Sequence, residues 1–304
     1  MRKLALVLAL VGLGACTAEH PAMSFVALGD APYGKPEEVF PPYKSLIENV
    51  NAAKPGLVVH IGDTHGHYTC DNALMDQLRG FMDDFDAPVL YTPGDNEWTD
   101  CGSTEEGSFD PLERLSYLRK TYFKGGMSLG AKPEKVQNQA RKGYPENARL
   151  MKGNVGFVTV HVVGSNNNFS PSDPAAADEF FARNTANVAW LEESFAKFKD
   201  ADAIVVALHA DMFVPLSGFR EGWHPMSPFR DIGITLGKQS SALEKPVLLL
   251  YGDSHVHKVF QPFAKYRPFL HAIEVYGYPD IKAIEVGVRP NAKKPFQVER
   301  VFNP

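Results

Sequence analysis

Cysteine is scarce in this chain, with three residues among 304. So few thiols exclude a small scaffold stapled by several disulfides. Acidic residues outnumber basic ones, 36 against 31, which gives a net charge of −5 and argues against a nucleic-acid partner. The sequence also lacks internal repeats and low-complexity tracts, which excludes a repeat architecture and a largely disordered chain.

A long apolar run occurs once, at the beginning of the sequence. Basic residues at 2–3 precede apolar residues at 4–13, and a Gly-Ala-Cys sequence ending at Cys16 follows. This order is typical of a secretory signal, and the run is too short to span a bilayer. Residues 13–16 also resemble a bacterial lipobox, which implies cleavage before Cys16 and lipid on its sulfur; an ordinary secretory signal is the alternative. We expect an exported, periplasmic protein that meets a membrane only through a lipid anchor at Cys16.

Removal of residues 1–15 would leave residues 16–304, a length that suits a single domain with an ample core. It would also move the net charge from −5 to −7, because two basic and no acidic residues are lost. Besides Cys16, only Cys70 and Cys101 would remain. An even pair of cysteines in an exported protein predicts a disulfide between them.

Short apolar runs rich in β-formers alternate with segments of helical spacing, which predicts βαβ units in an α/β fold. The expected strands are 25–28, 57–61, 88–91, 157–163, 203–208 and 247–251. The expected helices are 37–53, 74–85, 111–123 and 173–199. Residues 271–276, 281–288 and 296–301 are expected as antiparallel strands that complete a second sheet, and 124–147 as an irregular, mobile insertion.

Four of the predicted strands are followed by the same dipeptide, glycine and then aspartate. The aspartates are Asp30, Asp63, Asp95 and Asp253. Glycine permits a sharp exit from a strand, so the carboxylate lies at the carboxyl edge of the sheet, where open α/β folds bind ligands. His209 follows another strand, and His255 comes two residues after the last aspartate. Because crowded carboxylates repel one another, a bound cation is their simplest partner.

The order of these motifs resembles the calcineurin-like metallophosphoesterase family, from about residue 25 to residue 257. In that family an Asp-x-His motif is followed by Gly-Asp, Gly-Asn-His-Asp/Glu, a lone His and Gly-His-x-His. The resemblance implies two mixed β-sheets flanked by helices, two divalent ions, and phosphoester hydrolysis by a metal-bound hydroxide. The implied ligands are Asp30 and His255 for the first ion, Asp95, His209 and Asp253 for the second, and Asp63 for both.

The sequence departs from the family pattern in three of its motifs. Pro32 stands where the first motif has a metal-binding His. In the third motif, Asp95 replaces the Asn ligand and Asn96 replaces the His beside the leaving group. In the last motif, Asp253 replaces the first His of the pair.

These replacements change the formal charge expected at the centre. Four aspartates around two divalent ions leave a charge of about zero, whereas two carboxylates would leave about two positive charges. A neutral centre attracts a phosphate dianion less, so we expect phosphodiesters to be favoured over monoesters; a trivalent ion or a single metal is the alternative. Oxygen-rich ligands favour manganese, iron or magnesium over zinc.

Two further side chains are candidates for a metal or for hydrogen bonds to its ligands. Tyr33 follows the first motif closely, and the related purple acid phosphatases use a phenolate ligand; packing is the alternative role for this ring. A different register of the last motif would pair His255 with His257. We prefer the register that keeps the spacing after the strand ending at residue 251.

A general acid and substrate contacts must also be found. Asn96 has no acidic proton to donate, so His65 or His67 is expected to protonate the leaving group. Asn166 and Asn167 follow a predicted strand at the same edge and are expected to bind substrate oxygens, although runs of Asn are also common in turns.

The sequence is compatible with two classes of function. One is metal-dependent hydrolysis of a small phosphoester. The other is a non-catalytic binding protein that retains the fold and at most one metal. The lost histidines favour the second class, and the retained Asp63, His209 and His255 favour the first.

Overall fold

The computed structural model describes residues 21–66, 68–213 and 227–304. The expected signal at 1–15, the expected lipidation site Cys16 and the candidate acid His67 lie outside the described residues. Within the described part, no helix is long and apolar enough to cross a membrane.

The first sheet has five strands in the order β12-β11-β1-β2-β3. Their bounds are β1 Met23–Leu28, β2 Val58–His60, β3 Val89–Tyr91, β11 Ala283–Val288 and β12 Phe296–Phe302. Strands β1, β2 and β3 are parallel, with Val26 opposite Val58 and Val58 opposite Val89. Strand β11 runs antiparallel to β1. The three parallel strands therefore end at one edge of the sheet.

The second sheet has seven strands in the order β4-β5-β6-β7-β8-β10-β9. Their bounds are β4 Gln137–Gln139, β5 Tyr144–Lys152, β6 Val155–Thr159, β7 Ala203–Ala207, β8 Val247–Tyr251, β9 Lys258–Phe260 and β10 Leu270–Glu274. Strands β6, β7, β8 and β10 are parallel. This central group is buried almost completely, which explains its continuous apolar sequence.

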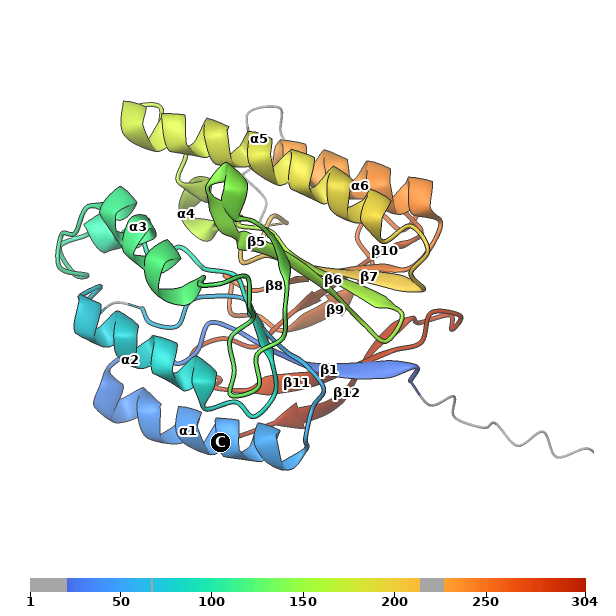
Figure 1. Cartoon of the computed structure of the whole chain (residues 1–304), viewed down its shortest axis with the longest axis horizontal. Helices are drawn as coiled ribbons and strands as arrows, with labels where there is room; N and C mark the ends of the chain where they lie inside the picture. The colour runs from blue at the N-terminus through green and yellow to red at the C-terminus, as the bar shows by residue number, and fades with distance from the viewer. Residues whose placement is uncertain (1–20, 67, 214–226) are drawn as a thin grey trace, which may run out of the picture.

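Helices cover the outer faces of both sheets (Figure 1). They are α1 Pro36–Ala52, α2 Asn72–Asp83, α3 Pro111–Tyr122, the short turn α4 Gly164–Asn167, α5 Pro174–Lys197 and α6 Arg230–Leu243, with 3-10 turns at Asp100–Gly102 and Ala140–Lys142. Three of the helices begin at an aspartate whose side chain accepts backbone N–H groups: Asp71, Asp110 and Asp173. Proline occupies the first turn after Asp110 and Asp173, where it costs no hydrogen bond.

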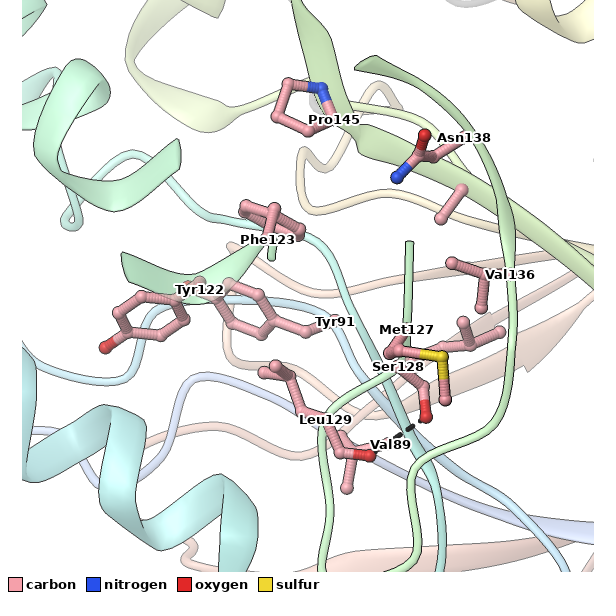
Figure 2. A pocket seen from close by; sticks show the side chains of 12 residues that line it. Val89, Tyr91, Tyr122, Phe123, Met127, Ser128, Leu129, Val136, Asn138 and Pro145 are labelled. Carbon is pink, nitrogen blue, oxygen red and sulfur yellow. Dashed lines mark hydrogen bonds between the residues drawn. The ribbon is translucent and has the colours of Figure 1, made fainter. Parts of the chain in front are cut away.

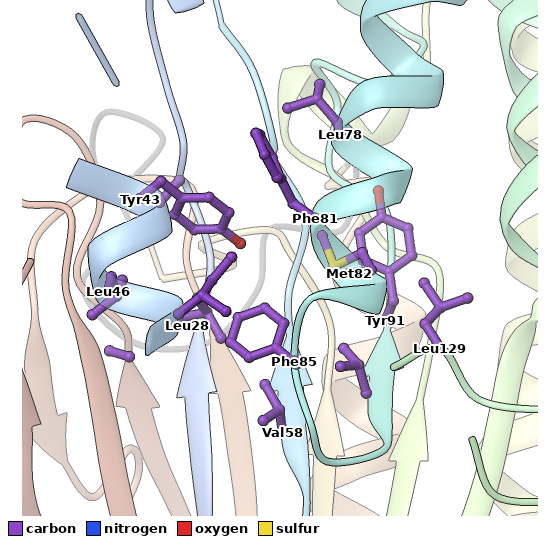
Figure 3. Close-up of a cluster of buried hydrophobic side chains, with 14 of the residues drawn as sticks. Leu28, Tyr43, Leu46, Val58, Leu78, Phe81, Met82, Phe85, Tyr91 and Leu129 are labelled. Carbon is purple, nitrogen blue, oxygen red and sulfur yellow. The ribbon is translucent and has the colours of Figure 1, made fainter. Parts of the chain in front are cut away.

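Three apolar clusters fill the spaces between these four layers. The first lies between the first sheet and helices α1 to α3, where Phe85, Tyr43 and Leu28 pack together (Figure 3). The second lies between the two sheets, and Phe25 meets Phe157 there edge to face. The third lies between the second sheet and helices α5 and α6. The layers are thus α/β/β/α, and the predicted fold class is confirmed.

The later strands are arranged differently from the prediction. Residues 281–288 and 296–301 correspond to β11 and β12, which join the first sheet and not the second. Strand β10 runs parallel to β8 and not antiparallel, because β9 and the turn after it reverse the chain before β10 begins. Helix α6 is not among the predicted helices; its buried face combines Ile232 and Leu236 with Gly233, Gly237 and Ser240.

Residues 124–147, expected as an irregular insertion, contain β4 and the first part of β5. A bridge between Val89 and Leu129 joins this segment to β3. Its side chains, including Met127 and Val136, form an apolar crevice with Tyr91 and Tyr122 (Figure 2). None of the predicted metal ligands lines this crevice.

Candidate metal centre

The carboxyl ends of strands from both sheets meet at one place. Asp30, Asp63 and Asp95 follow β1, β2 and β3 of the first sheet. His209 follows β7 of the second sheet, and its Nδ1 atom lies 2.9 Å from the carbonyl oxygen of Ile61 in the first sheet. This contact fixes the His209 ring between the sheets, with Nε2 facing the carboxylates.

Two sets of ligand atoms form there, and they share Asp63. One set is Asp30, Asp63 and His255, and the other is Asp63, Asp95 and His209; within each set the ligand atoms lie within 4.8 Å of one another. Nε2 of His209 lies 2.8 Å from Oδ1 of Asp95 and 3.4 Å from Oδ1 of Asp63. Nε2 of His255 lies 3.8 Å from Oδ1 of Asp30. The arrangement has the geometry of two cation sites with one common carboxylate.

Asp253 lies at the junction of the two sets. Its Oδ1 atom is 3.8 Å from Nε2 of His209, and its Oδ2 atom accepts the N–H of Asp211 at 2.9 Å. Its own N–H donates to Oδ1 of Asp30 at 3.1 Å. Asp253 therefore orients one ligand of the first set while its carboxylate faces the second set.

Glycines allow these carboxylates to approach the backbone. A Cβ atom on Gly94 would lie 2.0 Å from Oδ1 of Asp63, and one on Gly252 would lie 2.3 Å from Oδ2 of Asp30. A Cβ atom on Gly164 would lie 2.5 Å from Oδ1 of Asp253 and 2.6 Å from Oδ2 of Asp95. No side chain fits at these distances, so glycine is required where the carboxylates gather.

We expect Gly94→Ala to weaken manganese binding by about tenfold to a hundredfold, the range seen when groups that orient metal ligands are disturbed. The added methyl group must displace Asp63, the carboxylate common to both sets. Calorimetric titration with manganese measures the effect. The matched control is Gly80→Ala in α2, where a Cβ meets nothing within 4 Å; it should leave affinity unchanged and raise stability by about 0.5–1 kcal/mol. Wild-type affinity in Gly94→Ala would refute this role of the glycine.

The backbone of the proposed ligands is itself strained. Asp30, Asp63, Asp253 and His255 have φ values of 48°, 50°, 77° and 60°, in the left-handed region that non-glycine residues rarely adopt. Such conformations persist only where the surrounding structure enforces them, and they cluster at functional sites. Here they turn the side chains inward immediately after each strand.

Burial and mutual repulsion shift the pKa values of these groups. Burial raises the pKa of Asp30 to about 7 and that of Asp253 to about 6, against the opposing effect of His209. Burial also raises the pKa of Asp63 well above its usual value. Burial alone would lower the pKa of His209, but the charges of Asp63 and Asp95 hold it well above its usual value. Without a cation, the raised pKa values therefore favour protonated carboxyls at this site. The positive charge of the His209 imidazolium is the main opposing effect.

The donor atoms fit divalent cations. Oδ1 of Asp95 and Nε2 of His209 are fully buried, and neither makes a hydrogen bond of good geometry. Buried polar atoms normally have partners, and a cation bound by both atoms would supply one. Carboxylate oxygens with one imidazole in each set suit cations such as manganese, iron or magnesium.

Glu97, which the sequence analysis did not single out, organises the loops around Asp63. Its carboxylate accepts the N–H groups of Asp63, Thr64 and Gly94 at 3.1, 2.7 and 2.7 Å, and the Thr64 hydroxyl at 2.7 Å. The carboxylate thus accepts hydrogen bonds mainly from backbone N–H groups, and these bonds join the loop after β2 to the loop after β3. Its position directly after Gly94-Asp95-Asn96 was the only sequence signal for it.

Asn96 and Tyr33 lie beside the first set. The Asn96 side chain donates to Oδ2 of Asp63 at 2.9 Å, and its N–H donates to Oδ1 at 3.2 Å. The Tyr33 ring packs edge-on against His255, with ring centroids 4.9 Å apart. Burial raises the pKa of Tyr33, and a hydrogen bond with Asn96 opposes this shift.

His65, expected as a general acid, lies in another cluster. Its ring is buried beside Glu106, with Nδ1 3.6 Å from Oε2, and beside the disulfide of Cys70 and Cys101. Burial lowers the pKa of His65. The structure therefore does not support His65 as the proton donor to a leaving group. The Cys70–Cys101 disulfide itself is present as predicted.

The predicted substrate contacts are not retained. Asn167 is fully buried, and its side-chain oxygen accepts from Arg183 at 2.6 Å. The Asn166 side chain donates to the carbonyl oxygen of Phe169 at 2.5 Å. Both side chains hold the turn after β6, where residues 165–168 all have positive φ. Ser165 in this turn, missed from sequence, helps to lower the pKa of Asp95.

His257 belongs to neither ligand set. Its Nδ1 atom lies 2.6 Å from the carbonyl oxygen of Glu274, and its ring stacks on Tyr276 with centroids 4.3 Å apart. His255 instead contacts Tyr278 through Nδ1, 2.9 Å from the carbonyl oxygen, and turns Nε2 toward Asp30. The geometry favours the register in which Asp253 and His255 are the pair.

Comparison with known proteins agrees with this geometry. Residues 23–257 match the model of the calcineurin-like phosphoesterases, and the chain belongs to this family. A dimetal phosphatase from Danio rerio has a similar fold, with a TM-score of 0.54 and 10% identity over 93% of this chain and 99% of that one.

Two further solved structures are similar over much of the chain. GAP50, the anchor in the inner membrane complex of Plasmodium, gives a TM-score of 0.49 and 13% identity over 92% of this chain and 88% of that one. The 5'-nucleotidase from Candida albicans gives 0.44 and 12% over 92% and 51%. No curated protein sequence matches significantly. At such low identities the likeness extends to the fold alone.

Proposed function

We propose that this protein hydrolyses phosphoesters with two divalent cations, and phosphodiesters in preference to monoesters. The observation that carries the proposal is the pair of ligand sets, Asp30–Asp63–His255 and Asp63–Asp95–His209, joined at one carboxylate. Membership of the calcineurin-like phosphoesterase family supports the reaction class.

Cations held there would act as Lewis acids on the phosphoryl oxygens and would acidify water. The chain's own groups prepare the site for them. Asp63 serves both sets, and Asn96 holds both oxygens of that carboxylate through its amide and its N–H. Glu97 fixes the backbone that carries them, while Asp253 orients Asp30 through its N–H.

The charge at the centre supports the preference for diesters. Asp30, Asp63, Asp95 and Asp253 bring four negative charges to one site when ionised. With two divalent cations the formal charge is about zero, so the attraction for a dianionic monoester is weak. A diester carries one negative charge fewer, so it loses less hydration free energy on entering such a site.

A second function, ligand binding without catalysis, is favoured by one observation. The position that the family fills with a histidine beside the leaving group is Asn96, and His65 faces Glu106 instead. A chain with no proton donor would hold a phosphate compound without cleaving it. Substrates with a good leaving group separate the two functions, because they need no general acid.

We also propose that the protein is exported and lipid-anchored at Cys16, outside the described residues. The basic, apolar and small-residue order of residues 2–16 supports this placement. The anchor would bring the metal centre near a membrane. It does not change the proposed substrate, which is a small phosphoester.

The test uses one leaving group in two substrates. Bis(p-nitrophenyl) phosphate and p-nitrophenyl phosphate are compared before and after addition of manganese to metal-free protein. We expect manganese-dependent turnover of both, with kcat/KM for the diester higher by about tenfold, because a neutral centre does not offset the larger cost of desolvating the dianionic monoester. A higher value for the monoester would contradict the charge argument, and no turnover of either would favour the binding protein.

A further inference from the structure

A second cluster of ligand-type side chains lies apart from the metal centre. His65 and Glu106 are both buried beside the disulfide of Cys70 and Cys101. Oε2 of Glu106 lies 3.6 Å from Nδ1 of His65 and 3.3 Å from Sγ of Cys70. Ligand atoms of His65, Cys70 and Glu106 lie within 4.8 Å of one another, and the cluster shares no residue with the two sets above.

His65 is the unusual member of this cluster. Its side chain is 2% exposed, and neither ring nitrogen has a hydrogen-bond partner. Buried His60, by contrast, has a partner for each ring nitrogen: Nε2 lies 3.1 Å from the carbonyl oxygen of Ala31, and Nδ1 accepts the N–H of Gly62. A buried imidazole with two open nitrogens requires an explanation, and a metal ligand is one role that leaves its nitrogens directed away from protein partners.

We propose that reduction of the Cys70–Cys101 disulfide converts this cluster into a zinc site formed by His65, Glu106 and the two thiolates. A dithiol supplies two electrons and two protons, the sulfur–sulfur bond breaks, and the dithiol closes to its own disulfide. Zinc then replaces the two thiol protons, which leave to water. Two sulfurs, one nitrogen and one oxygen make the tetrahedral set that zinc prefers.

The two forms of the cluster hold the same two loops. The disulfide joins the loop after β2 to the loop after β3, and a zinc ion bound by the same cysteines would join them as well. Both sulfurs also lie beside the carbonyl oxygen of Asn96, at 3.6 Å for Cys70 and 3.3 Å for Cys101. Asn96 donates a hydrogen bond to the shared ligand Asp63. The cross-link, whether disulfide or zinc, therefore helps to fix the position of Asp63 in the main centre.

Thiolate ligands give the new site a metal preference different from that of the main centre. Soft sulfur donors select zinc, whereas the carboxylates of the main centre suit harder cations. Cobalt is a useful probe because a cobalt ion bound to thiolate absorbs in the near ultraviolet by charge transfer. The main centre has only oxygen and nitrogen ligands, so such absorption reports the Cys70–Cys101 cluster alone.

The experiment uses the chain with Cys16→Ser, in which Cys70 and Cys101 are the only cysteines. The protein is reduced with a dithiol, freed of reductant without oxygen, and titrated with cobalt and then zinc. We expect the reduced protein to bind one more ion than the oxidised protein, to show thiolate-to-cobalt absorption, and to lose it when zinc is added. Zinc should also protect both thiols from alkylation.

Two variants make the assignment specific. His65→Ala and Glu106→Gln should each lower the zinc affinity of the reduced protein at least tenfold, whereas His271→Gln, at a site remote from the cluster, should not change it. If the reduced chain unfolds without metal, zinc should restore its circular dichroism in wild type but not in His65→Ala. Absence of thiolate absorption, or wild-type zinc affinity in His65→Ala, would overturn the proposal.

Discussion

Replacing Asp63 by Asn should lower phosphodiester turnover by about a thousandfold or more, because metal ions contribute several kcal/mol to phosphoryl transfer. Asp63 is the one carboxylate common to both ligand sets, so the substitution removes a charged ligand from each. The amide keeps the shape of the side chain, which limits the effect on folding. Initial rates with bis(p-nitrophenyl) phosphate at saturating manganese measure the change.

The matched control for this variant is Asp76→Asn. Asp76 lies on α2 and accepts a hydrogen bond from the Tyr117 hydroxyl at the surface, so its replacement should leave turnover unchanged. Retention of more than a tenth of wild-type activity in Asp63→Asn would mean that the shared carboxylate does not hold the working metals.

Ionisation of Asp30 and Asp253 should cost the metal-free protein stability as pH rises from about 4 to about 7, and bound metal should cancel this cost. Burial raises the pKa of Asp30 to about 7 and of Asp253 to about 6, so the folded state retains protons that the unfolded chain has released. Below the usual carboxyl pKa, each such group contributes its full stabilisation to the folded state. As pH rises from the usual carboxyl pKa to the pKa in the folded protein, the free energy of unfolding falls by about 1.4 kcal/mol per pH unit for each group.

Titration of His209 also lowers the stability of the folded protein as pH rises, but at higher pH than the carboxyls. Its pKa is held well above the usual value by Asp63 and Asp95 despite burial, so its stabilising effect is present below pH 6.5 and is lost as pH rises further. The pKa of Asp95 is lowered by His209 against the effect of burial, so its contribution is lost only when pH falls below the usual carboxyl range. Neither group reverses the fall between pH 4 and 7.

Thermal unfolding measures this behaviour directly. The melting temperature is recorded at pH 5 and pH 8 with a chelator and with manganese. Because cations replace the retained protons, the stabilisation by manganese should be much larger at pH 8 than at pH 5. A manganese effect that is equal at the two pH values would contradict the crowding of ionised carboxylates around the cations.

The structure brings the predicted ligand residues together where the chain itself fixes the geometry. A strand followed by Gly-Asp places a carboxylate at a sheet edge, and parallel pairing of β1, β2 and β3 brings three such edges together. The disulfide followed from the two cysteines that remain once Cys16 is set aside. In these cases a local signal and the parallel sheet were sufficient.

Other features depend on contacts between distant segments, which local patterns do not contain. The side chain of His65 turns toward Glu106, 41 positions along the chain, and Asn167 is drawn inward by Arg183 of α5. Glu97 binds backbone N–H groups, and backbone partners leave no residue-specific trace in a sequence.

The most direct test of the two-cation centre is the metal content of purified wild-type protein and of Asp63→Asn after dialysis against manganese, measured by mass spectrometry with quantified protein. The shared carboxylate predicts two ions per chain in wild type and at most one in the variant. One ion or none in wild type, or two ions in the variant, would contradict a centre built around Asp63.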